Sequence, residues 1–201
     1  VYYAMGVPRN IPDTKNYKGV REQSNIAKLK TFWIDIDVGV EAGKYPSRKE
    51  AASAIQEFVR KTGLPKPFVV SSGRGFHVYW PMDTPINAST WTDHAQRLKA
   101  LATSEKLRQD PTRTADCASV LRPVGTLNWK GDTPTKVEMV FEGVVSPTEQ
   151  LLAQLRSFHV VPAAIPNKVS LDIPGDRPIG ADTRAVLSEM EQELANASAY
   201  T

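Results

Sequence analysis

The sequence predicts an α/β (α+β) domain in which strands and helices alternate along the chain. Short segments rich in β-branched and aromatic residues are typical of strands, and longer segments with apolar residues at helical spacing lie between them. The sequence contains no internal repeat and no low-complexity tract. Solenoids and coiled coils are therefore excluded.

Three elements are expected in the first forty residues. Residues 1–7 predict a strand, and residues 31–38 predict a second strand that is rich in aromatic and β-branched side chains. The polar segment between them, residues 8–30, is long enough to suggest a loop with a functional role.

The clearest helix is predicted over residues 47–62. Ser47 and Glu50 have the spacing of a capping box, an apolar face follows, and Gly63 ends the helix. Two antiparallel strands joined by a tight turn come next, over residues 68–71 and 76–80.

The second half of the chain predicts another helix, further strands and a proline-rich end. The helix carries Trp91, Ala95, Leu98 and Ala102 at helical spacing. The remaining elements are strands over 120–127 and 136–141, a helix over 147–158 begun by Ser146 with Pro147 at its first position, a proline-rich linker over 161–180 and a helical segment over 181–201. The main domain is thus expected to span residues 1–160.

Composition narrows the class of protein. The chain is 41% hydrophobic and 23% charged, and no apolar stretch approaches the ~20 residues of a membrane-spanning helix. The first residues lack the basic flank of a secretory signal, and the absence of an initiator Met suggests a piece of a longer chain. A single Cys117 cannot form an internal disulfide, so a reducing cytoplasm is expected.

The net charge of +3 is weak support for a polyanionic partner, and the distribution of charge is more informative. Loose basic groups of this kind are compatible with a solvated surface as well as with nucleic acid. The two groups comprise Lys15, Lys18, Arg21, Lys28 and Lys30, and then Arg108, Arg113, Arg122 and Lys130.

Two aspartates lie on one face of the second predicted strand. Strand alternation in Phe32-Trp33-Ile34-Asp35-Ile36-Asp37-Val38 sends the apolar set beginning with Phe32 to the core and both carboxylates to the other face. Carboxylates within ~7 Å of each other repel when ionised and are natural ligands for Mg²⁺ or Mn²⁺. Two solvated aspartates on an exposed sheet face are the alternative.

The turn Ser72-Gly73-Arg74-Gly75 and the following His77 suggest a phosphate site. Two glycines around Arg74 allow close backbone approach, expose amide donors and present a guanidinium fork. His77 follows on the outgoing strand, where an imidazole can reach the same phosphate. An ordinary hairpin with a structural histidine is the alternative.

A third block runs from Asp110 to Lys130. Asp110 precedes Arg122 by twelve residues, and residues 125–130 add a backbone turn, an amide and an ammonium group. Either Asp110 or Asp116 can instead serve a turn through its side-chain oxygens. Because Asp110 precedes a proline, its backbone is biased toward the extended conformation, whereas small residues around Asp116 favour a capped turn.

Together the three blocks resemble the archaeo-eukaryotic primase superfamily, and most closely the primase-polymerase domains of phage and plasmid replication proteins. The resemblance spans roughly residues 1–142 and rests mainly on the phrases Ser-Gly-x-Gly-x-His-x-Tyr-Trp and Leu-Arg-x-x-Gly-Thr-x-Asn-x-Lys. It implies a catalytic sheet like that of an RNA-recognition motif, accompanied by an additional α/β unit. It also implies DNA primase and DNA polymerase activity.

The resemblance further implies roles for particular residues. Asp35, Asp37 and Asp110 would bind the catalytic Mg²⁺ or Mn²⁺ ions. Nucleotide-binding residues would be Ser72, Arg74, His77, Arg122 and Lys130. The expected partners are a single-stranded DNA template and nucleoside triphosphates, and a helicase domain is common in related chains.

One feature departs from the family pattern. Many members have Ser-x-His in the second motif, whereas Gly75 stands at that serine position here. Two other functions also stay open from the residues: a metal-dependent nuclease, and a nucleic-acid-binding module without catalysis.

Overall fold

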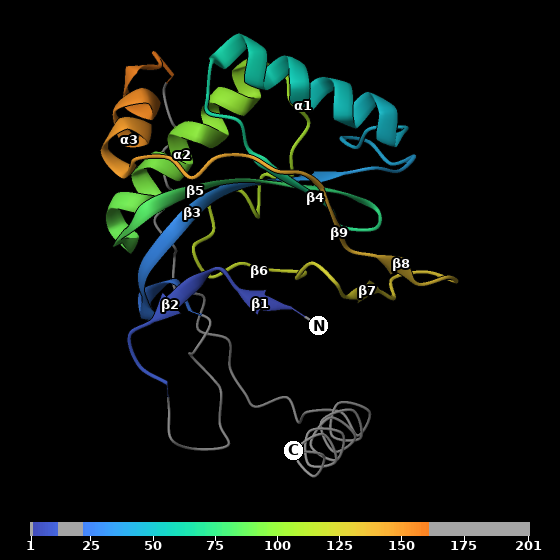
Figure 1. Cartoon of the computed structure of the whole chain (residues 1–201), viewed down its shortest axis with the longest axis horizontal. Helices are drawn as coiled ribbons and strands as arrows, with labels where there is room; N and C mark the ends of the chain where they lie inside the picture. Colours follow the sequence, from blue (N-terminus) through green and yellow to red (C-terminus); the bar gives the residue numbers. More distant parts are fainter. Residues whose placement is uncertain (1, 12–21, 161–201) are drawn as a thin grey trace, which may run out of the picture. The chain divides into compact units, whose positions relative to one another are not determined.

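A five-stranded antiparallel sheet lies at the centre of the computed structural model, which describes residues 2–11 and 22–160. The strands follow the order β2-β3-β5-β4-β9, and within the described residues three helices lie on one side of them (Figure 1). This arrangement confirms the predicted α+β class. The elements are β2 (Gly6–Pro8), β3 (Ile26–Asp37), β4 (Phe68–Ser71), β5 (Gly75–Asn87), β9 (Glu138–Phe141), α1 (Arg48–Thr62), α2 (Ala88–Ser104) and α3 (Thr148–Ser157).

The other side of the sheet carries only short elements. Strand β1 (Tyr3–Ala4) pairs with β6 (Val120–Leu121), and β7 (Leu127–Asn128) pairs with β8 (Thr135–Lys136). Both ribbons lie on the side away from the helices in Figure 1. The linker over 161–180, the helical segment over 181–201 and the basic residues Lys15, Lys18 and Arg21 lie outside the described residues.

The prediction that apolar side chains of β3 alternate toward the core is confirmed by their burial. Phe32, Ile34 and Ile36 are buried and pair with buried residues of β5, which pack toward α1. The strand begins at Ile26 rather than at residue 31, because its first residues pair with β2 on one side and with the end of β5 on the other. Strand β5 likewise continues past Pro81, which sits beside a register shift in the β3 pairing, where a proline is tolerated.

The first two helices form as their sequence signals predict. The Ser47 hydroxyl accepts a hydrogen bond from the Glu50 N–H (3.2 Å), and Gly63 ends α1 with a φ of 62°. In α2 the predicted apolar face is buried against the sheet.

The start of α3 differs from the prediction by one residue. Pro147, not Ser146, is the N-cap, because Ser146 is held in an extended bridge to Met82. The cap is supplied from β5, where the Asp83 carboxylate accepts from the Thr148 N–H (3.0 Å) and hydroxyl (2.6 Å). A negative charge there also suits the helix N-terminus.

Three of the predicted strands are each divided into shorter segments in the structure. Residues 1–7 form two strands in different sheets, with a break at Met5. Residues 120–127 are interrupted by a turn in which Gly125 has a φ of 87°. Residues 136–141 are divided at Val137, which is buried between β8 and β9.

Candidate active site

The two aspartates of β3 lie on the face of the sheet that the helices do not cover. Asp35 stands directly across from His77 of β5, and Asp37 stands across from Gly75. The Asp35 side chain is 17% exposed, whereas Asp37 is open to solvent. The paired strands thus bring two of the predicted residues together with the histidine.

Asp110 joins this pair from a distant part of the chain. Its N–H donates to the Asp35 carbonyl (2.8 Å), at a part of β3 that lies beyond the residues paired with β2. The Asp110 carboxylate accepts from both the N–H (2.8 Å) and the hydroxyl (2.6 Å) of Thr112. These bonds orient one carboxylate oxygen while the backbone fixes the residue beside Asp35.

Asp116 has the turn role that its neighbours predict. Its carboxylate accepts from the side chain of Gln23 (2.8 Å), from the Ala118 N–H (3.1 Å) and from the Ser119 hydroxyl (3.0 Å). Asp110 also serves a turn, but its charge, unlike that of Asp116, acts on Asp35.

Asp35, Asp37 and Asp110 form an acidic group whose negative charges are not fully compensated by the nearby arginines. Burial, followed by the charges of Asp37 and Asp110, raises the pKa of Asp35 from 3.8 to about 7, although Arg113 and Arg122 oppose this rise. Carboxylate oxygens are the donors that Mg²⁺ and Mn²⁺ prefer, so the residues present suit a hard divalent cation. Within residues 2–11 and 22–160, however, no three His, Cys, Asp or Glu side chains converge closely enough to form a ready-made metal centre.

His77 lies at the buried end of a hydrogen-bonded chain that also contains the hydroxyl groups of Tyr79 and Tyr3. Tyr3 donates to the Tyr79 hydroxyl (3.3 Å), which lies 3.0 Å from His77 Nδ1. Burial raises the pKa of Tyr79, and burial together with the Arg122 charge lowers the pKa of His77 to about 4. A neutral imidazole that accepts at Nδ1 carries its proton on Nε2, which lies 3.8 Å from Asp35 Oδ1.

The turn over residues 72–75 packs tightly against its neighbours, which explains the departure at Gly75. A Cβ atom at Gly75 would collide with the Ile36 carbonyl of β3, so a serine cannot stand there without backbone movement. Gly73 has a φ of 92°, and a side chain there would collide with Thr135 of β8. Arg74 is exposed, and its guanidinium packs against Gly131.

The amide noted in residues 125–130 is Asn128, and the structure gives it a role that the sequence did not predict. It is buried, its amide donates to the Ser72 carbonyl (2.8 Å), and its oxygen accepts from the Lys130 N–H (3.0 Å). It therefore fixes the predicted phosphate turn to the β7–β8 ribbon. Its place in the phrase Gly-Thr-x-Asn-x-Lys was the available signal.

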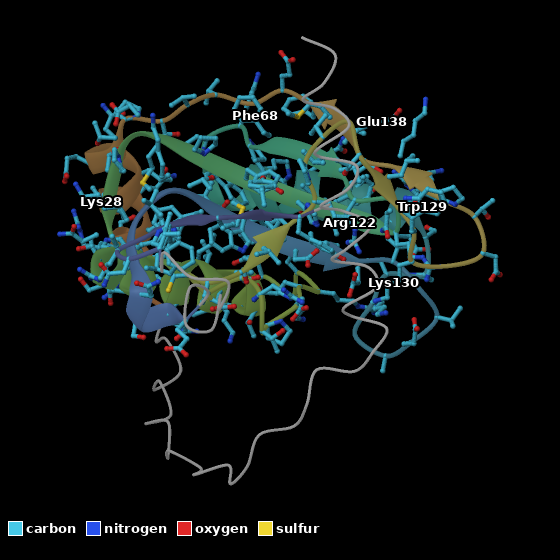
Figure 2. All side chains as sticks on the ribbon, turned by 90° about the horizontal axis from the view of Figure 1, so that it is seen from below. Lys28, Phe68, Arg122, Trp129, Lys130 and Glu138 are labelled. Atoms are coloured by element: carbon cyan, nitrogen blue, oxygen red, sulfur yellow. The ribbon has the colours of Figure 1, made fainter. Side chains whose placement is uncertain are left out.

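The predicted basic residues occupy different parts of the open face. Arg122 is close enough to lower the pKa of both Asp35 and His77, and it also donates to the Tyr2 hydroxyl (2.6 Å). Arg122 and Lys130 lie at one end of this face in Figure 2, whereas Lys28 lies at the other. Lys28 is seven residues from Asp35 along β3, or about 23 Å, so the structure does not bring it to the carboxylates.

A cleft of about 500 Å³ lies elsewhere, between α1, β4 and β9. Its lining is mainly apolar and includes Ile55 and Phe141. None of the predicted site residues lines it. No described helix has the length and apolar character needed to cross a membrane.

Comparisons with known proteins gave structural neighbours only. No family model and no curated protein matches the sequence. The archaeo-eukaryotic primase domain of the cyanophage S-2L primase-polymerase matches with a TM-score of 0.49 and 22% identity, over 68% of this chain and 65% of that one. The polymerase domain of Mycobacterium tuberculosis ligase D, solved in complex with DNA, matches with a TM-score of 0.38 and 17% identity, over 77% of this chain and 58% of that one.

The chain thus spans less than two thirds of the length of either neighbour. Neither match gives support to the expected helicase partner.

Proposed function

We propose that the chain is the catalytic domain of a primase-polymerase, which joins nucleotides on a single-stranded DNA template in phage or mobile-element replication. The observation that carries this proposal is the position of Asp35 beside His77, on the face of the sheet that the helices leave open, with the charges of Asp37 and Asp110 acting on it. Residues 75 positions apart in the sequence, Asp35 and Asp110, are joined there by a backbone hydrogen bond.

The three carboxylates would hold Mg²⁺ or Mn²⁺. When bound, two such ions neutralise the triphosphate and lower the pKa of the attacking hydroxyl. In the reaction, the 3′-hydroxyl of the growing strand would lose its proton to water and its oxygen would form a bond to the α-phosphorus of the nucleotide. The bond from that phosphorus to the bridging oxygen would break, and pyrophosphate would leave.

The chain's own residues would bind and orient the triphosphate. With the Tyr79 hydroxyl donating to Nδ1, neutral His77 would carry its proton on Nε2 and donate it to a phosphate oxygen. The exposed Arg74 guanidinium can pair with two phosphate oxygens at once. Arg122 and Lys130 would add positive charge around the same group, and Ser72 would be held in place by Asn128.

A chain-growth assay tests the proposal. The wild-type chain should extend a strand on single-stranded DNA in the presence of Mg²⁺ or Mn²⁺, and Asp35→Asn and Asp37→Asn should lose this activity while binding the template normally. Reactions with and without primer, and with each nucleotide type, would define the substrate. Shortening of the strand would identify a nuclease, and template binding without turnover would identify a silent binding module.

The phosphate role of the turn has its own test. Arg74→Ala should raise the nucleotide KM by at least about tenfold while template Kd changes little, because Arg74 is exposed and supports no core packing. Equal increases in both constants would assign the turn to the template instead.

A further inference from the structure

Trp129 differs from the three other tryptophans of the chain. Trp33, Trp80 and Trp91 are 0%, 2% and 0% exposed, whereas Trp129 is 70% exposed. An indole held in water exposes a large flat apolar surface that could otherwise be buried.

The backbone that carries Trp129 is fixed on both sides. Asn128 is buried and donates to the Ser72 carbonyl (2.8 Å), and its side-chain oxygen accepts from the Lys130 N–H (3.0 Å). Asn128 also pairs with Thr135 in the β7–β8 ribbon. The indole is thus presented from an ordered backbone, which lowers the entropy cost of binding to it.

Positive charge flanks the indole. Lys130 follows directly and is exposed, and Figure 2 shows Arg122, Trp129 and Lys130 at the same end of the open face. The exposed acidic residue nearest in sequence is Asp132. An aromatic platform beside cations is the combination by which proteins bind single-stranded nucleic acid without sequence preference.

Asn128 and Trp129 are neighbours in sequence but differ in exposure. Asn128 is buried and bound to the turn over residues 72–75, whereas Trp129, which follows the end of β7, is largely exposed. The indole is therefore open to a ligand from solvent, while the residue before it holds the backbone in place.

We propose, resting on the function proposed above, that Trp129 stacks on a base of the single-stranded template. Trp129 is then a positioning residue, which holds the template relative to the carboxylates. Because every base has a π-face, this contact tolerates any template sequence.

Tryptophan fluorescence of the full chain can test the proposal directly, because only one indole is open to solvent. In the presence of EDTA, a short oligothymidine should quench wild-type fluorescence, and the remaining emission of Trp129→Phe should not respond. Trp129→Ala should weaken oligothymidine binding about 5- to 100-fold, and Trp129→Phe should recover most of that loss. An abasic oligonucleotide of equal length should bind the wild type and Trp129→Ala alike.

Unchanged oligothymidine affinity in Trp129→Ala would overturn the proposal. Quenching by a nucleoside triphosphate alone, as strong as that by the oligonucleotide, would overturn the assignment to the template strand. The binding assay needs no catalysis, so it separates the two proposals. Base-dependent quenching without nucleotide incorporation would leave the stacking role intact while rejecting the enzyme, and incorporation without quenching would do the reverse.

Discussion

The two faces of the five-stranded sheet are built from the same strands but carry different kinds of residue. On the helix side, Ile34 and Ile36 are buried against residues of β5. On the other side, the alternate positions Asp35 and His77 gather charge and hydrogen-bonding groups. Under the proposed function, one face of the strand contributes stability and the other contributes chemistry. Substitutions on the two faces should therefore have different effects.

The largest expected effect is a loss of activity when a carboxylate on the open face is replaced. Asp110→Asn should reduce nucleotide incorporation at least ~10³-fold, because it removes one of the three charges that would hold the metal ions. The amide keeps an oxygen for the bonds from Thr112, so the melting temperature should change little. Melting curves and extension assays on the same preparations provide both measurements.

Asp116→Ala is the matched variant for this test. It removes the acceptor of the turn bonds from Ala118 and Ser119, so it should cost ~1 kcal/mol of stability and only partly reduce activity. If Asp116→Ala were inactive but fully stable while Asp110→Asn stayed active, Asp116 and not Asp110 would be assigned as the third metal ligand.

Substitutions on the helix-covered face should lower the stability of the fold instead of its activity. Trp91 of α2 stacks on Phe32 at 5.7 Å between ring centroids and donates to the Thr31 carbonyl (2.7 Å). Trp91→Ala should therefore lower the free energy of unfolding by ~3–5 kcal/mol, as measured by urea denaturation. Trp129→Ala removes the same side chain from the exposed side and should change it by less than ~0.5 kcal/mol. Equal losses would contradict the division between the faces.

A smaller expected effect is a pH dependence of the free energy of unfolding that comes from Asp35 on the open face. The pKa of Asp35 is about 7 in the folded chain and 3.8 ordinarily, so the folded state binds a proton more tightly than the unfolded state. The resulting stabilisation is complete below about pH 4 and is lost as pH rises through about 7. In EDTA, Asp35→Asn should thus be more stable than the wild type at pH 8, by ~1–3 kcal/mol. A lower melting temperature of Asp35→Asn at pH 8 would contradict this charge balance.

Local sequence signals predicted the helices better than the short strands. The cap at Ser47, the stop at Gly63 and the apolar spacing around Trp91 each act within a few residues, so they could be recognised without the fold. Tyr3 and Leu121, in contrast, form strands because they pair with each other across the chain. Such pairing leaves no periodic pattern in segments of two residues.

The same limit applies to the candidate site. Strand alternation predicted that Asp35 and Asp37 share a face, because that relation is local. The contact of Asn128 with the Ser72 carbonyl joins positions 56 residues apart and involves a backbone acceptor, which no side-chain pattern encodes.

The hydrogen bond between the Asp110 N–H and the Asp35 carbonyl has a consequence for the order in which the chain matures. During synthesis Asp35 emerges long before Asp110, so a nascent chain that has completed the β3–β5 pairing still lacks the third carboxylate. The acidic group is completed only when the later segment closes against the edge of β3. Incompletely folded chains would therefore be unable to capture divalent cations in a catalytic arrangement, and catalytic competence would report that this long-range closure has taken place.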